Sequence, residues 1–229
     1  MSISTPNYSS GNDRFGAEAA TWDSQPEVVE SSRLCLDAVL RHSDHFPSLS
    51  SSSVLEIGCG TGLLTVPLAQ HVGSILALDT AQGMIDMLSA KLSSNAIQHK
   101  VSAKVKLLES ADDPVLEAKK FDVALSHLVF HHVPNMQQLV DVMFGTLNKG
   151  GRIWISDFED DGPQAEAFHP KAKHAGVERH GLKRDEMHNI LTNAGFTNVE
   201  VFESFQMQKK VESGQTQSFP FLAITGIRP

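Results

Sequence analysis

Cysteine is scarce in this chain: only Cys35 and Cys59 occur among its 229 residues. Two cysteines, one of them inside a glycine-rich loop, do not make a disulfide framework, so we predict a cytoplasmic protein in a reducing compartment. No apolar run approaches the roughly 18 residues that a membrane-spanning helix needs, which predicts no membrane partner. The first residues have neither an apolar signal-peptide core nor the arginines of a transit peptide.

The chain also has few basic residues: it contains 19 Lys and Arg but 27 Asp and Glu, which gives a formal net charge of −8. Binding of a nucleic-acid backbone needs clustered cations, so this balance argues against a nucleic-acid partner. The length is sufficient for one domain with a full core. We predict a disordered tail over residues 1–14, which are rich in Ser, Asn and Gly, and one domain over residues 15–229.

What the chain does contain is a glycine-rich loop between an apolar run and a helix-like stretch. Residues 54–62 read V-L-E-I-G-C-G-T-G. Glycines in such a strand–turn–helix remove Cβ atoms, so backbone N–H groups can approach a ligand closely. A second apolar run, 74–78, ends in Asp79, where a carboxylate can hydrogen-bond both hydroxyls of a ribose. These features predict a nucleoside-binding edge on an α/β sheet.

The spacing of the glycines separates two classes of nucleoside cofactor. The dinucleotide fingerprint is G-x-G-x-x-G, but here the third glycine comes one residue early, at Gly62, and Leu63 takes the fingerprint position. The sequence E-x-G-C-G-T-G instead resembles motif I of the class I S-adenosylmethionine-dependent methyltransferases. F-D at 121–122, H-H-V at 131–133 and L-x-x-G-G at 147–151 follow in the order typical of that family.

The resemblance implies an α/β fold built on a doubly wound, seven-stranded and mostly parallel sheet. The implied strand order is 3-2-1-4-5-7-6, with the last strand antiparallel and helices on both faces. Residues 15–45 are expected to form an N-terminal helical cap over the cofactor, and the third strand is expected at 105–108. Trp22 on this cap is either a substrate contact or core packing.

Within this fold S-adenosylmethionine is the implied cofactor. Met84 either packs on the adenine or belongs to the core, and either Ser110 or Asp112 accepts from the adenine amino group. In the family, the acidic residue at position 56 supports the loop and the methionine end of the cofactor. The full set of expected cofactor contacts is Glu56, Gly58, Cys59, Gly60, Thr61, Gly62, Asp79, Thr80, Met84, Ser110, Ala111, Asp112 and Ser126.

Histidines gather after the expected fourth strand, 121–125, in the stretch S-H-L-V-F-H-H-V-P. In the resembled family this stretch lines the methyl-donor end of the pocket, so Phe130 is expected to contact substrate. Transfer to a hydroxyl, thiol or ammonium requires removal of a proton, which histidine, with an ordinary pKa of about 6.5, is suited to accept. The candidate bases are His131, which we favour, His127, His169 and His180.

The least generic segment is 157–184, where an acidic run is followed by a basic, histidine-bearing run. Loops of this length are usually lids or substrate sites, and we expect this one to be either of these or a solvated loop with internally paired charges. A metal site built from Asp157, His169, His174 and His180 is chemically possible. Because these spacings match no compact zinc motif, we expect no metal.

Together these features predict an enzyme that transfers a methyl group from S-adenosylmethionine to O, N or S of a small-molecule acceptor. The acidic charge and the expectation of no added recognition domain favour a small acceptor. The alternatives are a protein methyltransferase of the same fold, a non-catalytic S-adenosylmethionine-binding protein and a nicotinamide oxidoreductase.

Overall fold

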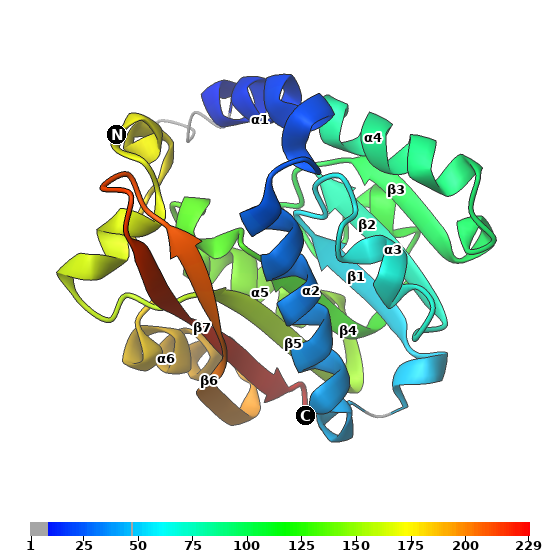
Figure 1. Ribbon diagram of the computed structural model, residues 1–229. Coiled ribbons are helices and arrows are strands. Elements are labelled where there is room, and N and C mark those ends of the chain that lie inside the picture. The colour runs from blue at the N-terminus through cyan, green and yellow to red at the C-terminus, as the bar shows by residue number, and fades with distance from the viewer. Residues whose placement is uncertain (1–8, 47) are drawn as a thin grey trace, which may run out of the picture.

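A computed structural model describes residues 9–46 and 48–229 of the chain, and a single sheet runs through it (Figure 1). The strand order is β3-β2-β1-β4-β5-β7-β6, with β7 antiparallel to both of its neighbours. The predicted strand order and the antiparallel last strand are therefore confirmed. The strands are β1 Ser53–Ile57, β2 Ser74–Asp79, β3 Val101–Val105, β4 Phe121–His127, β5 Leu147–Phe158, β6 Thr197–Lys210 and β7 Thr216–Ile227.

Alternate residues of the central strands enter two separate hydrophobic cores. Val123 and Leu125 of β4 belong to one core, whereas Ala124 between them belongs to the other. Trp154 of β5 lies in the first core, with residues 153 and 155 in the second. Strands buried on both faces read as continuous apolar runs, which is why the sequence pattern locates β1, β2 and β4 closely.

Helices cover both faces of the sheet. The helices are α1 Ser9–Trp22, α2 Pro26–Arg41, α3 Thr65–Leu68, α4 Gln82–Ser93, α5 Met136–Thr146 and α6 Arg184–Ala194. Short 3₁₀ helices occupy Ser43–His45, Leu49–Ser51, Gln98–Lys100, Pro114–Leu116, Phe130–His132, Pro163–Phe168 and Lys171–Gly176. Helices α2, α3 and α4 contribute to the first core and α5 and α6 to the second. No helix among the described residues has the length and apolar character required to cross a bilayer.

The N-terminal helix begins earlier than the sequence indicates. Helix α1 starts at Ser9, so the predicted disordered tail is wrong for residues 9–14, and residues 1–8 lie outside the described part. The later part of α1 packs against the start of α4 near the top of Figure 1, where Ala19 joins Ala81 and Met84 in a small apolar cluster. Their backbones approach so closely that a Cβ on Gly83 would lie 2.7 Å from the carbonyl oxygen of Gly16.

The third strand is displaced from its predicted position. It spans Val101–Val105 and pairs with β2 from Val101 opposite Ile75 to Val105 opposite Asp79, so the prediction of 105–108 is wrong. This strand lies at the edge of the sheet and is largely exposed, with the sequence V-S-A-K-V. The sequence of a half-solvated edge strand has few apolar residues, so the more apolar stretch at 105–108 gives a stronger strand signal than residues 101–105. The sequence pattern therefore predicts the strand too far along the chain.

Segment 157–184 returns to the sheet at both of its ends. Glu159 and Leu182 form a parallel bridge, and between them lie the two 3₁₀ helices at 163–168 and 171–176. Lys173 in the second of these forms an ion pair of 3.1 Å with Glu18 on α1. The segment is therefore closed at its base beside the end of β5, where Leu182 donates to the carbonyl of Phe158, and is tied to the N-terminal cap.

Candidate active site

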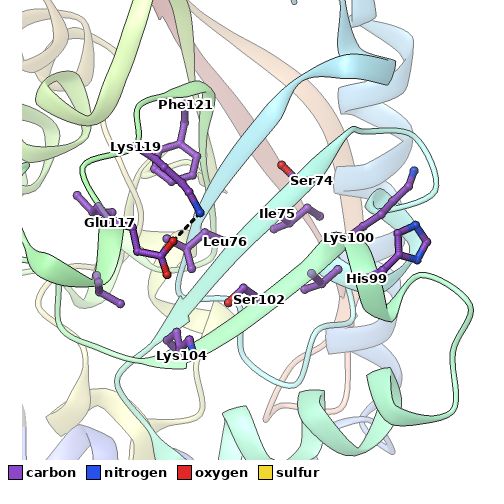
Figure 2. Close-up of a pocket in the computed structure, with 13 residues that line it drawn as sticks. Ser74, Ile75, Leu76, His99, Lys100, Ser102, Lys104, Glu117, Lys119 and Phe121 are labelled. Atoms are coloured by element: carbon purple, nitrogen blue, oxygen red, sulfur yellow. Dashed lines mark hydrogen bonds and ion pairs between the residues drawn. The ribbon is translucent and has the colours of Figure 1, made fainter.

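A cavity of about 840 Å³ opens at the carboxyl ends of β1, β2 and β4. The strand order reverses between β1 and β4, and such a reversal point is where open α/β sheets bind their ligands. A smaller cavity of about 230 Å³ lies at the opposite, amino ends of β2 and β3, where Glu117 and Lys119 pair at 2.6 Å (Figure 2). Its position at the wrong edge of the sheet leaves the larger cavity as the candidate active site.

Asp79 connects the end of β2 to the glycine-rich loop. Its Oδ2 accepts from the backbone N–H of Gly60 at 2.9 Å, and its Oδ1 accepts from the N–H of Ala81, also at 2.9 Å. Burial raises the pKa of the Asp79 carboxyl, while these backbone donors act in the opposite direction. The carboxyl is thus fixed beside the loop, with Thr80 and Asp79 both on the cavity wall.

Two glycines of the loop have different tasks. Gly60 has a φ of +54°, and a Cβ built on it meets nothing within 4 Å, so this position faces open space on the cavity wall. Gly62 has a φ of +82°, and a Cβ there would lie 2.3 Å from a methyl carbon of Leu88 on α4. Gly60 therefore leaves room for a ligand, whereas Gly62 permits close packing of α4 and does not line the cavity, so its cofactor contact stays a prediction.

Glu56 is a buried carboxyl on the cavity wall. It is 2% exposed, and its Oε2 has no hydrogen-bond partner among the described residues. Burial raises the pKa of Glu56 to about 8, with the charge of Asp79 adding to the effect and the polar Thr65 side chain opposing it. An unpartnered buried acceptor costs about 1–3 kcal/mol, and a cationic ligand group would remove that cost.

Three residues, which we call the cap latch, hold the end of α1 against the glycine loop. The Thr61 hydroxyl donates to Asp23, and Lys91 forms an ion pair of 2.5 Å with Asp23. Lys91 also donates to the backbone carbonyl of Thr61 at 2.7 Å. The latch places Trp22 and Phe15, which pack edge-to-face at 5.8 Å, on the cavity wall.

The predicted bases occupy different environments. His127 at the end of β4 lines the cavity, and its two ring nitrogens are buried with no partner among the described residues. Burial lowers the pKa of His127 to about 4, so the ring is neutral at neutral pH. His131 is 2% exposed and does not line the cavity, nor do His169 and His180.

His131 is held by a buried carboxylate. Its Nδ1 lies 2.9 Å from Oδ1 and 3.0 Å from Oδ2 of Asp157, which is fully buried. Asp157 also accepts from the backbone N–H groups of His131 and Phe158. His132, which is not among the candidate bases, does line the cavity, and burial with the neighbouring His131 lowers its pKa to about 3.

The sequence of this chain is similar to that of a known protein family. The model of a family described as a methyltransferase domain matches residues 29–201, well over half of the chain. The chain belongs to this methyltransferase family.

Individual relatives agree with that assignment. An uncharacterised methyltransferase of Schizosaccharomyces pombe is 26% identical over 192 residues, which cover 80% of this chain and 67% of the yeast protein. A ubiquinone biosynthesis O-methyltransferase of Rickettsia felis is 30% identical over 114 residues, or 50% of this chain, and only 44% of that relative is matched. The N-methyltransferase NodS of Bradyrhizobium japonicum, solved with S-adenosyl-L-homocysteine, has the same fold, with a TM-score of 0.67, 19% identity and coverage of 97% and 99%.

The predicted family is therefore confirmed: the protein is a class I, S-adenosylmethionine-dependent type of methyltransferase, with S-adenosylmethionine as the cofactor of its class. The nicotinamide oxidoreductase alternative is wrong. Membership of the family does not by itself identify the residues that hold the cofactor or the acceptor.

The methyltransferase presents a different third-strand tip to the cavity from the one predicted. Residues 106–109 line it, whereas Ser110, Ala111 and Asp112 do not. Ser110 instead accepts from the N–H of Asp112, and Ala111 packs over Gly145 on α5. The difference arises because β3 ends at Val105, three residues before its predicted end at Leu108, so the residues just after the strand are 106–109.

Two further predicted contacts belong to the interior. Ser126 is fully buried and donates to the carbonyl oxygen of Ile57 at 3.0 Å, so it joins β4 to β1 instead of contacting a cofactor. Phe130 is also fully buried, in the core beneath α5 and α6, and its substrate contact stays a prediction that this position does not favour. A turn of 3₁₀ helix directs successive side chains to different sides, and within the stretch 126–134 the residues that line the cavity are 127–129 and 132–134.

The cavity also includes residues that sequence reasoning did not select. Val28, Ser31 and Ser32 of α2 line it, and their i, i+3, i+4 spacing is a recognisable signal of one helix face. Residues 135, 138, 139 and 142 at the start of α5 contribute another wall, as do Gly176 and Glu178. No local pattern identifies the last two, because the return of segment 157–184 brings them there.

Proposed function

We propose that this methyltransferase binds S-adenosylmethionine in the large cavity and transfers its methyl group to O, N or S of a small-molecule acceptor. This proposal rests on the observation that a single cavity connects Asp79 and the glycine loop with His127. In the proposed arrangement Asp79 binds the ribose hydroxyls and Glu56 receives the ammonium of the methionine end. Met84 and Leu108 also line the cavity and would contact the adenine.

The cofactor supplies an electrophilic methyl group on a sulfonium, which an acceptor attacks in line. The protein aligns the acceptor and removes its proton where one must leave. Among the predicted bases, His127 lines the cavity and has unpartnered ring nitrogens, whereas the favoured His131 does not line it. We therefore assign proton acceptance to His127 in place of His131. Burial keeps this ring neutral, so it can take a proton, and the charge of Asp157 stabilises the protonated form.

A small acceptor is favoured by what covers the cavity. Phe15 and Trp22 of the cap lie on one side and Gly176 of segment 157–184 on another. The ion pair between Lys173 and Glu18 connects these two covers. A protein substrate needs an open groove, and this ion pair narrows the opening above the cavity. Because segment 157–184 covers the cavity in this way, we propose it as the lid of the acceptor end. The acidic net charge of −8 supports a partner other than nucleic acid.

The test is transfer from isotopically labelled S-adenosylmethionine to a panel of phenols, amines and thiols, read by mass spectrometry. His127→Gln should lower turnover by roughly 10²–10⁴ while leaving the affinity for S-adenosylhomocysteine nearly unchanged. His188→Gln, an exposed histidine of α6, is the matched control and should keep full activity. Labelling of proteins in an extract, with no small acceptor methylated, would overturn the small-molecule assignment.

A further inference from the structure

Three histidines from two distant parts of the chain converge beside the acceptor end of the cavity. His131 and His132 lie in the 3₁₀ helix after β4, and His169 follows the 3₁₀ helix 163–168. One ring nitrogen from each can be chosen so that all lie within 4.8 Å of one another. Their ring centroids are 4.0, 5.0 and 6.0 Å apart. Three imidazoles on one tetrahedral ion, with metal–nitrogen bonds of about 2.0–2.1 Å, have ring centres about 5 Å apart.

The outer hydrogen bonds of two rings fix which nitrogen carries the lone pair. A carboxylate accepts from Nδ1 of His131, and a backbone carbonyl, that of Gly176, accepts from Nδ1 of His132 at 2.7 Å. Both acceptors require a proton on Nδ1, so Nε2 of each ring is left with its lone pair. Nε2 of His131 is buried and has no partner among the described residues. The buried Nδ1 of His169 is likewise without one.

This outer arrangement is the one that orients histidines toward a metal. Metal-binding histidines nearly always donate their other N–H to a carboxylate or a backbone carbonyl. Asp157 and the Gly176 carbonyl occupy these two positions. Arg179 strengthens the frame by donating to the carbonyls of Phe130 and Val133 on either side of the pair. Segment 157–184 thus supplies the candidate ligand His169 and the two acceptors, Asp157 and the Gly176 carbonyl. It also supplies Arg179, which holds the turn around the histidine pair.

We propose that His131, His132 and His169 bind one divalent transition-metal ion of the zinc class, with Asp157 and Gly176 orienting two of the ligands. Imidazole ligands suit zinc, copper, iron and nickel, and three protein ligands leave a coordination position for a further group. His132 also lines the cavity, so an acceptor oxygen or sulfur bound there would become more acidic. This role extends the proposed function, since His127 is a weak base for an unactivated acceptor.

The ligand set differs from the one considered on sequence spacing. His169 is the one shared ligand, and Asp157 acts through His131 instead of binding the ion. His174 is occupied differently, because its Nε2 lies 3.0 Å from the carbonyl oxygen of His169. His180 stacks on His174, with ring centroids 4.5 Å apart. The sequence-based expectation of no metal is replaced by this proposal.

The test uses the full-length, untagged chain and two probes, Zn²⁺ measured by elemental mass spectrometry and Co²⁺ measured by visible absorption. All proteins carry His45→Gln, because His42, Asp44 and His45 form a second, partly exposed group that could bind metal weakly. The background protein should retain about one equivalent of Zn²⁺ after gel filtration and should give ligand-field bands with Co²⁺. Asp157→Asn should lower the Zn²⁺ affinity by about 10–100-fold, and His169→Gln should lower it at least as much. His174→Gln is the control that should retain affinity.

Binding of S-adenosylhomocysteine, measured on every variant, separates this proposal from the proposed function. A protein that binds S-adenosylhomocysteine but retains no Zn²⁺ would overturn the metal site and leave the methyltransferase assignment intact. Equal Zn²⁺ affinity in the background protein and in His169→Gln would also overturn the site. Zn²⁺ binding without S-adenosylhomocysteine binding would instead refute the cofactor assignment alone.

Discussion

Replacing Glu56 by glutamine should stabilise the free protein by an amount that grows with pH. Burial raises the pKa of Glu56 from 4.5 to about 8 in the folded state. Between these values the folded protein retains a proton that the unfolded chain releases, so the free energy of unfolding falls as pH rises. Above about pH 8 both states are ionised and the loss is complete. Glutamine does not ionise, so Glu56→Gln escapes this loss.

The size of the effect follows from the two pKa values. At 1.36 kcal/mol per pH unit, the interval from 4.5 to about 8 corresponds to about 5 kcal/mol in full. The part that develops between pH 5.5 and pH 8 is about 3 kcal/mol. Urea unfolding gives the free energy of unfolding of the wild type and of Glu56→Gln at each pH. The difference between the two proteins should be about 3 kcal/mol larger at pH 8 than at pH 5.5. Parallel pH profiles of the two proteins would refute the reasoning.

Cofactor binding should reverse the ionisation of Glu56. At pH 7 a group with a pKa of about 8 is roughly nine-tenths protonated. If the ammonium of the methionine end binds Glu56, the carboxyl ionises and close to one proton is released for each molecule bound. Calorimetry of S-adenosylhomocysteine binding in two buffers of different ionisation enthalpy measures this number. Glu56→Gln should abolish the release and weaken binding, and a buffer-independent binding enthalpy in the wild type would contradict the assignment.

Three other substitutions test the remaining parts of the site. Asp79→Ala should weaken S-adenosylhomocysteine binding by about 1.5–3 kcal/mol in calorimetry, because a charge-assisted bond to the ribose is lost; unchanged affinity would remove Asp79 from the site. Asp23→Asn opens the cap latch and should lower both the affinity and the melting temperature, the latter by several degrees; an effect on neither would show that the latch does not hold the cap. Gly62→Ala should lower the free energy of unfolding by about 1–3 kcal/mol, because of its positive φ and the contact with Leu88. Gly16→Ala is its control, because a Cβ there meets nothing within 4 Å of it, and it should be neutral or stabilising.

The parts of the fold that the sequence predicts well are locally encoded. The glycine loop requires positive φ at Gly60 and Gly62, and the buried strands around it need continuous apolar runs. Both requirements are met within a few residues, so β1, β2, β4 and Asp79 lie where they are expected. Strand β3 is half-solvated and lacks such a run, so its predicted position is wrong, and Ser110, expected at its tip, lies outside the cavity lining.

The histidines mark the limit of local reasoning. A pattern such as H-H-V identifies the turn, but which ring enters the cavity depends on the direction of each side chain on a 3₁₀ helix. His132 enters it, and His131 points to Asp157 instead. His169 joins them only because segment 157–184 folds back over the turn, with two of its backbone N–H groups donating to the carbonyl of His131. Tertiary contacts of this kind have no signature in sequence spacing.

The most direct test of the central claim is a crystal structure of the protein with S-adenosylhomocysteine bound. The account predicts the ribose beside Asp79, the amino group beside Glu56 and the sulfur facing the end of β4 near His127. A ligand bound in the smaller cavity at the amino ends of β2 and β3, or one in the large cavity with its ribose away from Asp79, would contradict it.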